Sequence, residues 1–417
     1  MSHEEKSGQP IELYYDVVCP YARLGYYRVA ALAAAYGRPL HLKPVLLGGL
    51  FQAHEAPQVP ASTWGPSRQA YILQDILWSS ARAGRPVEMP AGHPQRTVSA
   101  MRLLTAASAA QVGPLSEALF EAYWARGLDV TDRAVLAELA AGVGLSIDVI
   151  DDPAVKDALR DNTAAAAARG MFGVPTVVYG DQMWWGQDRL HFLEAALAGH
   201  PVEPAVRLSN RTGRPVRFFH DFSSPFSYLA ATQISAIARR HGSPVEWTPI
   251  LLGALFKQIG TADVPLFTFS EARQQAFIRD AAEWARWWGV DFAFPANFPL
   301  RSVLPLRVAI LCPEATLPLY RAYWAEGRDI SDAAVVKDVL LESGLDAGVV
   351  DRAEEARDGL KANTALAVEK GVFGLPTFVV EDEVLIWGQD RLFLLEDVIA
   401  GWSPAIETPT PPRVYDY

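Results

Sequence analysis

Two segments at matching positions of the chain place a sulfur or oxygen nucleophile directly before a proline. The segments are Cys19-Pro20 and Ser224-Pro225, which lie 205 residues apart. Proline suits the first turn of a helix, where its missing N–H is no loss, so Cys19 and Ser224 are expected at helix starts. A thiol at that position should have a depressed pKa and be reactive or easily glutathionylated. Serine there could instead be a simple helix cap. The chemistry of the two segments therefore differs.

The rest of the chain also repeats. The run GMFGVPTVVYGDQMWWGQDRL begins at Gly170, and GVFGLPTFVVEDEVLIWGQDRL begins at Gly371. A repeat of roughly 200 residues is too long for a solenoid unit and indicates a duplicated globular domain. We expect one domain over residues 1–203 and a second over 204–417.

The composition excludes several classes of protein. The 417 residues are 50% hydrophobic and 20% charged, with a formal charge of −11 and a pI near 5.3, which argues against a nucleic-acid or anionic-membrane partner. No uninterrupted apolar run reaches the ~18 residues of a membrane span, and the N-terminal residues lack a signal-peptide pattern. The two cysteines, Cys19 and Cys312, fall in different repeats, which excludes a disulfide framework and a cysteine-based metal site. A cytoplasmic location is the simplest interpretation.

The elements that must position Cys19 and Ser224 follow one order in both repeats. Alternating and apolar runs predict a strand, a helix and a second strand, then about 110 residues with helical spacing, two short strands and a final helix. This order predicts an α/β protein with two tandem thioredoxin-like domains, each carrying an α-helical insertion. A proline-containing linker is expected over Gly199–Pro215, and a proline-rich tail after Trp402. The predicted strands are 11–15, 40–47, 176–179 and 182–185, with 216–220, 245–252, 377–381 and 384–387 in the second repeat.

Three segments of the second repeat, DFSSPFSYLA, NTALAVEKGVFGLPT and WGQDRL, resemble a known family. They are similar to 2-hydroxychromene-2-carboxylate isomerase and kappa-class glutathione transferase, in the DsbA-type branch of the thioredoxin superfamily. The resemblance covers essentially all of both repeats, and its motifs are specific in combination. It implies glutathione as the cofactor, with Ser224 stabilising the glutathione thiolate. Glutathione sulfur would be the nucleophile, because an unassisted hydroxyl is a weak one.

The resemblance also implies further glutathione contacts. Pro175 and Pro376 would be cis prolines, against the alternative of ordinary trans turns. The backbone of Val174 or Leu375 would then pair in strand fashion with the cysteinyl part of glutathione.

A second set of contacts would hold the γ-glutamyl end. Gln187 and Asp188 in the first repeat, and Gln389 and Asp390 in the second, would form this corner, with the Asp accepting the ammonium group. Helix capping by a first-turn acid is the alternative.

One cation and three candidate substrate residues complete the expected site. Lys257 could stabilise the thiolate or anchor a substrate carboxylate, although a solvated surface lysine is the commoner case. The family usually has Asn where this chain has Thr261, and Gln52 replaces the lysine in the first repeat. Phe226, Asn297 and Trp387 are expected to line the substrate cleft.

These features predict a glutathione-dependent isomerase, or conjugating transferase, acting on an electrophilic and aromatic small molecule. In the isomerase version the thiolate adds to a conjugated carbon, a neighbouring bond rotates, and elimination restores the thiol. A monothiol oxidoreductase acting through Cys19 is one alternative. A non-catalytic protein that binds a thiol or a hydrophobic ligand is another. The two domains are expected to pack as an internal pseudo-dimer in a monomeric chain.

Overall fold

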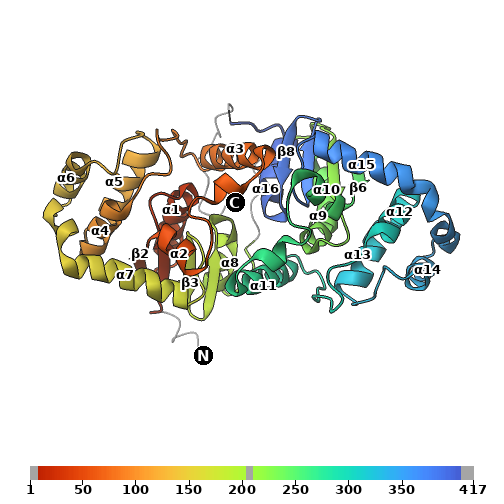
Figure 1. Ribbon diagram of the computed structural model, residues 1–417, viewed down its shortest axis with the longest axis horizontal. Helices are drawn as coiled ribbons and strands as arrows, with labels where there is room; N and C mark the ends of the chain where they lie inside the picture. The colour runs from red at the N-terminus through yellow and green to blue at the C-terminus, as the bar shows by residue number, and fades with distance from the viewer. Residues whose placement is uncertain (1–7, 203–209, 405–417) are drawn as a thin grey trace. The chain divides into compact units, whose positions relative to one another are not determined.

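The computed structural model describes residues 8–202 and 210–404, and these form two units (Figure 1). The first unit contains residues 8–63, 73–202 and 404, and the second contains residues 64–72 and 210–403. The segment Trp64–Ile72 therefore belongs to the second unit, although it lies within the first repeat of the sequence. Parts of the expected linker (203–209) and tail (405–417) lie outside the described residues.

A four-stranded sheet forms the centre of the first unit. Its strands are β1 (Ile11–Tyr15), β2 (Leu40–Pro44), β3 (Thr176–Tyr179) and β4 (Gln182–Trp185), in the order β2-β1-β3-β4. Strand β1 pairs in parallel with β2, as expected for a strand–helix–strand connection, and antiparallel with β3. Strands β3 and β4 form an antiparallel hairpin. The connecting helix is α1 (Pro20–Ala35).

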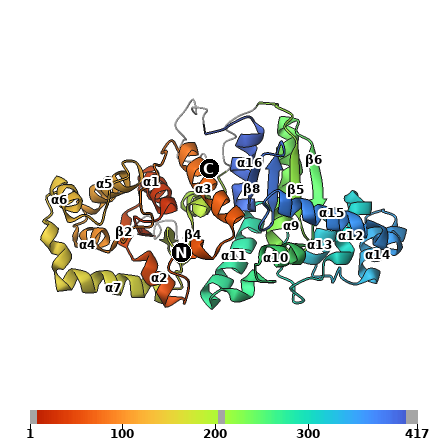
Figure 2. The ribbon, with the colours of Figure 1, turned by 45° about the horizontal axis from the view of Figure 1, so that its top comes forward.

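The second unit repeats this sheet. Its strands are β5 (Val216–His220), β6 (Val245–Pro249), β7 (Thr377–Val380) and β8 (Val384–Trp387), in the order β6-β5-β7-β8. The strand pairings have the same directions as in the first unit. Helix α9 (Pro225–His241) connects β5 to β6, and Figure 2 shows these two strands side by side.

A helical insertion separates the second strand from the hairpin in each unit, which confirms the expected fold class. Figures 1 and 2 both show α4 to α7 gathered together, and likewise α12 to α15. In the first repeat the helices are α2 (Leu47–Ala53), α3 (Pro66–Arg82), α4 (Val98–Ala106), α5 (Val112–Trp124), α6 (Arg133–Gly142) and α7 (Pro153–Ala168), followed after the hairpin by α8 (Leu190–Ala198). In the second they are α10 (Leu252–Ile259), α11 (Glu271–Trp287), α12 (Val303–Leu311), α13 (Thr316–Trp324), α14 (Ala333–Glu342) and α15 (Arg357–Glu369), followed by α16 (Leu392–Ile399). None of the helices within the described ranges is long and apolar enough to cross a membrane.

The second strand of each repeat is shorter than predicted. It ends at Pro44 or Pro249, three residues early, because proline has no N–H to continue the ladder. The apolar residues that follow begin α2 and α10 instead. The N–H of Leu47 donates to the Asp16 carboxylate at 2.9 Å, and that of Leu252 to Asp221 at 2.8 Å.

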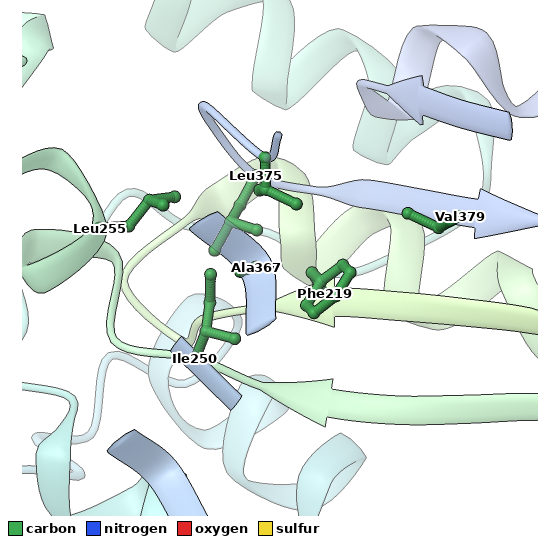
Figure 3. Close-up of a cluster of buried hydrophobic side chains, with 7 residues drawn as sticks. Phe219, Ile250, Leu255, Ala367, Leu375 and Val379 are labelled. Atoms are coloured by element: carbon green, nitrogen blue, oxygen red, sulfur yellow. The ribbon is translucent and has the colours of Figure 1, made fainter. Parts of the chain in front are cut away.

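A buried apolar cluster joins the sheet of the second unit to the loop before β7. Figure 3 shows the side chain of Leu375, from this loop, directed toward residues of β5, α10 and α15. This packing fixes the loop and therefore the direction of its backbone carbonyls. The labelled members are Phe219, Ile250, Leu255, Ala367, Leu375 and Val379.

Candidate thiol-binding site

Ser224 is the N-cap of α9, and its hydroxyl also faces the loop before β7. The Oγ atom accepts a hydrogen bond from the N–H of Ser227 at 3.1 Å. It donates to the carbonyl oxygen of Leu375 at 3.4 Å, which is a long hydrogen bond. The side chain is 6% exposed. The prediction that Ser224 caps the helix is therefore confirmed. Capping uses Oγ only as an acceptor, so the hydroxyl proton remains available to a ligand.

The loop opposite Ser224 has the predicted cis proline. The Leu375-Pro376 bond is cis, and so is Val174-Pro175 in the first unit, which confirms both predictions. The Thr377 hydroxyl donates to the Gly374 carbonyl at 2.7 Å, and the Gly388 N–H donates to the Pro376 carbonyl at 2.9 Å. The loop is thus bound on both sides of Leu375. Two further cis bonds that the sequence did not suggest, His93-Pro94 and Phe298-Pro299, lie in the insertions.

A buried aspartate supports the turn that leads into α9. Asp221 is fully buried, and its carboxylate accepts the N–H groups of Ser223 at 2.9 Å and Leu252 at 2.8 Å. Burial raises the pKa of Asp221, while these N–H groups and the Ser302 hydroxyl act to lower it. Sequence reasoning missed this role. The signal was available, since an aspartate follows the first strand in both repeats.

An insertion helix also supports this turn. The indole Nε1 of Trp324, on α13, donates to the carbonyl of Phe222 at 2.8 Å in the buried interior. Trp124 on α5 makes the same contact with Val17 in the first unit, also at 2.8 Å. Each insertion therefore holds the residues just ahead of the helix cap.

The equivalent position in the first unit behaves differently from what the sequence predicts. Cys19 is 8% exposed, and its thiol lies 3.3 Å from the carbonyl oxygen of Val174. Burial raises the pKa of Cys19 to about 12, against the lowering effect of the N–H groups of Ala22 and Tyr21. The expected depression of this pKa is therefore wrong, because desolvation of a thiolate outweighs the helix N-terminus here.

Neither cysteine is in a disulfide, as expected. Cys312 directly follows α12, and its sulfur lies 3.7 Å from the Glu314 carboxylate. The residue is only partly buried, because it follows the helix and does not lie on its apolar face.

The expected γ-glutamyl corner is a single 3₁₀ turn in each unit. Gln389 is 3% exposed, and the Asp390 carboxylate lies 3.6 Å from the Arg391 guanidinium. In the first unit Asp188 lies 2.6 Å from Arg189. Each aspartate thus already has a cationic neighbour.

The glycine before this turn has a specific steric role. Gly388 has φ of 103°, and a Cβ there would lie 2.4 Å from the Asp390 carboxylate. Gly186 has φ of 100° and the same relationship to Asp188. The corner geometry therefore requires glycine at this position.

Lys257 lies in the last turn of α10 with an exposed side chain. Within the described part of the chain, no hydrogen bond joins it to Ser224. Its helix ends at Gly260 with φ of +71°, and Glu55 occupies the equivalent position in the first unit at φ of 54°. Gln52 is likewise exposed in the last turn of α2. The structure does not bring Lys257 into direct contact with the helix cap.

The predicted substrate residues lie in different places. Trp387 packs against Gly374, since a Cβ on that glycine would lie 2.9 Å from the indole Nε1, and its ring is 5.0 Å from that of Phe373. Phe226, on α9, lies edge-on to Phe277 of α11 at 4.8 Å. Asn297 is exposed and hydrogen-bonds Asp329. Trp387 therefore lies next to the loop that contains Leu375. Asn297 instead contacts Asp329.

The amino-acid sequence of each repeat is similar to that of known proteins. The sequence profile of the DSBA-like thioredoxin domain matches residues 10–198 and again residues 215–400. A 2-hydroxychromene-2-carboxylate isomerase of Pseudomonas sp. (strain C18) is 29% identical over 202 residues, which cover 46% of this chain and 92% of that protein. Glutathione S-transferase kappa 1 of Rattus norvegicus is 32% identical over 219 residues, which cover 47% of this chain and 95% of that protein.

A solved structure of 2-hydroxychromene-2-carboxylate isomerase is similar over 45% of this chain and 94% of its own, with 24% identity and a TM-score of 0.40. Each of these relatives spans about the length of one repeat. The family profile accounts for most of the chain in two consecutive copies. The chain therefore belongs to the DSBA-like thioredoxin domain family, with two such domains in tandem.

Proposed function

We propose that the second unit binds glutathione with its sulfur beside Ser224 and uses it to isomerise, or to conjugate, an electrophilic aromatic small molecule. The observation that carries this proposal is the hydroxyl of Ser224, which is oriented by the helix it caps and donates only a long hydrogen bond to Leu375. The names of the relatives, an isomerase and a glutathione transferase, support the same class of reaction.

The residues of this site fit a thiol carrier. The Ser224 Oγ lies 3.4 Å from a neutral carbonyl oxygen, so its proton can turn to a better acceptor such as a thiolate. The first turn of α9 adds the positive end of the helix dipole, which favours an anion. Next to the loop, the buried indole Nε1 of Trp387 has no hydrogen-bond partner among the described residues, so it is an available donor.

The bound glutathione would supply a thiol that adds reversibly to a conjugated carbon while a neighbouring bond rotates. The chain's own contribution is to hold that thiol deprotonated. Ser224 donates one hydrogen bond to the anionic sulfur, and its own oxygen stays fixed by the Ser227 N–H. This hydrogen bond lowers the free energy of the sulfur anion. The protein need not rearrange to make it, because Asp221 and Trp324 already fix the turn before Ser224.

The first unit is poorly suited to the same role. Cys19 carries its proton at neutral pH, because burial raises its pKa to about 12. Since the thiolate is the reactive form of cysteine, this also weighs against the monothiol oxidoreductase alternative. The second unit is therefore the proposed active one.

Calorimetry with glutathione tests the proposal directly. We expect wild type and Cys19→Ala to bind glutathione with the same stoichiometry at the second unit, and Ser224→Ala to bind it more weakly at pH values where the bound thiol is ionised. Turnover of a panel of aromatic electrophiles by the same three proteins separates catalysis from binding. No glutathione binding at all would refute the proposal. Tight binding without turnover would favour the non-catalytic alternative.

A further inference from the structure

Two arginines of the second unit stack on aromatic rings. Arg68 belongs to the segment Trp64–Ile72, and its guanidinium carbon lies 4.4 Å from the ring centroid of Trp64. Arg273 lies in the first turn of α11, 3.8 Å from the ring centroid of Phe269. The rings fix the guanidinium planes but provide no counter-charge.

No acidic group compensates these two cations. Neither Arg68 nor Arg273 makes an ion pair or a hydrogen bond with any residue that the structure describes, and the Nε of Arg68 is buried without an acceptor. By contrast, Arg240 in the same unit binds Glu396 through two hydrogen bonds of 2.8 and 3.0 Å. A buried guanidinium donor without a partner is costly, so this pair of residues has unused binding capacity.

The two cations are also close enough to repel each other. Burial lowers the pKa of Arg68. Burial and, to a smaller extent, the positive charge of Arg68 together lower the pKa of Arg273 to about 10. Both side chains are only half-buried, so a solute can reach them. An anion between or beside them would relieve both the desolvation and the repulsion.

The same region lies next to the loop of the candidate site. The Arg68 guanidinium is 5.9 Å from the ring centroid of Trp387, which packs against Gly374. The Tyr71 hydroxyl lies 3.1 Å from both the backbone N and the backbone O of Trp387, so it ties the arginine-bearing segment to the end of β8. Arg68 is therefore held beside the strand that leads into the Gln389-Asp390 turn.

We propose that Arg68 and Arg273 form an oxyanion-binding site in the second unit, which takes a carboxylate or phosphate group. Planar guanidinium forks match these groups through paired charge-assisted hydrogen bonds, and the aromatic rings pre-orient them. The oxyanion is either part of a molecule bound at the thiol site, such as a carboxylate of glutathione or of the substrate, or a separate multivalent anion. The site stands on the arginine geometry and does not depend on the proposed reaction.

Inorganic phosphate is the probe for this site. Its binding is measured by calorimetry and by the phosphate-induced rise in Tm, at an ionic strength held constant with NaCl so that general screening is matched. We expect Arg68→Gln and Arg273→Gln each to weaken phosphate binding by about tenfold or more, which is the usual effect of losing a charged hydrogen bond. Arg68→Lys keeps the charge but not the fork, and should fall between wild type and Arg68→Gln.

Arg85→Gln is the matched control. Arg85 stacks at 3.4 Å from the ring centroid of Tyr27 in the first unit, but the acidic Glu121 lies nearby. Phosphate binding should not change in this variant. The Tm without phosphate reports any structural loss separately, so a variant that merely unfolds more easily is distinguished from one that loses the anion.

A second arm identifies the source of the oxyanion. Competition between phosphate and glutathione would assign the site to a carboxylate of glutathione, and independent binding would assign it to another molecule. Both results support the site, and neither requires turnover. The inference fails if phosphate stabilises the wild type no more than chloride does, or if both Gln variants bind phosphate as tightly as the wild type.

Discussion

The hydroxyl of Ser224 lies 3.4 Å from the carbonyl oxygen of Leu375, although the two residues are 151 positions apart in the chain. The side chain of Leu375 packs in the core of the second unit, so its carbonyl cannot easily turn away (Figure 3). A capped helix start and a core-anchored loop thus face each other across one long hydrogen bond. In the proposed complex the hydroxyl proton turns from this carbonyl to the glutathione sulfur.

Ser224→Ala should reduce glutathione-dependent kcat/KM by about 10²-fold, because it removes a donor to the sulfur anion. The loss of the helix cap will also cost about 1 kcal/mol of stability. Asp332→Ala is the matched control, since the Asp332 side chain caps α14 through the Ala334 N–H at 2.8 Å away from the candidate site. This control should lose a similar amount of stability but keep its activity. If both variants lose the same activity, the effect of Ser224→Ala is structural, and the proposed role of the hydroxyl is wrong.

The Cys19 thiol should react slowly with iodoacetamide at pH 7. Burial raises its pKa to about 12, and only the thiolate attacks, so the rate should keep increasing with pH well beyond the range of an ordinary cysteine. The measurement uses Cys312→Ala to isolate one thiol, and Cys19→Ala for comparison. Cys312 is less buried than Cys19, so it should be alkylated first in the wild type. Full modification of Cys19 at pH 7 within the time needed for Cys312 would contradict this prediction.

Gly388→Ala should destabilise the second unit by about 1–3 kcal/mol, because φ of 103° is strained for any L side chain and the new Cβ would meet the Asp390 carboxylate. The same change should weaken glutathione binding if the Gln389-Asp390 turn holds the γ-glutamyl end. Gly253→Ala, on α10 with open space around its Cα, is the control and should be neutral or slightly stabilising. Denaturant unfolding and calorimetry provide the two readouts.

Asp221→Ala should destabilise the second unit by about 2–4 kcal/mol. The change leaves the N–H groups of Ser223 and Leu252 without an acceptor in a buried place, and each such loss costs about 1–3 kcal/mol. Because the carboxyl is buried with a raised pKa, its ionised form is penalised, and this penalty grows as pH rises through and above its ordinary value. Asp221→Asn removes the charge, so its stability should depend less on pH than that of the wild type in this range. An unchanged pH profile of stability in Asp221→Asn would contradict the assigned cause.

Much of the local structure could be predicted from the sequence. The strand Ile11–Tyr15 has the bounds that its apolar pattern indicates, and so does Val216–His220. Pro20 and Pro225 occupy first turns of helices as expected. These features depend on neighbouring residues, so the local pattern contains the necessary information. The duplication then transfers each inference from one repeat to the other.

Other properties depend on atoms that are distant in the chain. The helix start alone suggests a low pKa for Cys19, but the packing around it excludes water and reverses the shift. Asp221 and Trp324 support the turn before Ser224 through contacts with Leu252 and Phe222, which are 31 and 102 positions away from them in the chain. The pairing of Arg68 with Arg273 likewise appears only when a segment of the first repeat is found in the second unit. Residue types and spacing thus determined which two helix starts carry a thiol or a hydroxyl. Burial and long-range contacts, set by tertiary packing, decided that the pKa of Cys19 is raised and that the Ser224 hydroxyl faces the Leu375 carbonyl.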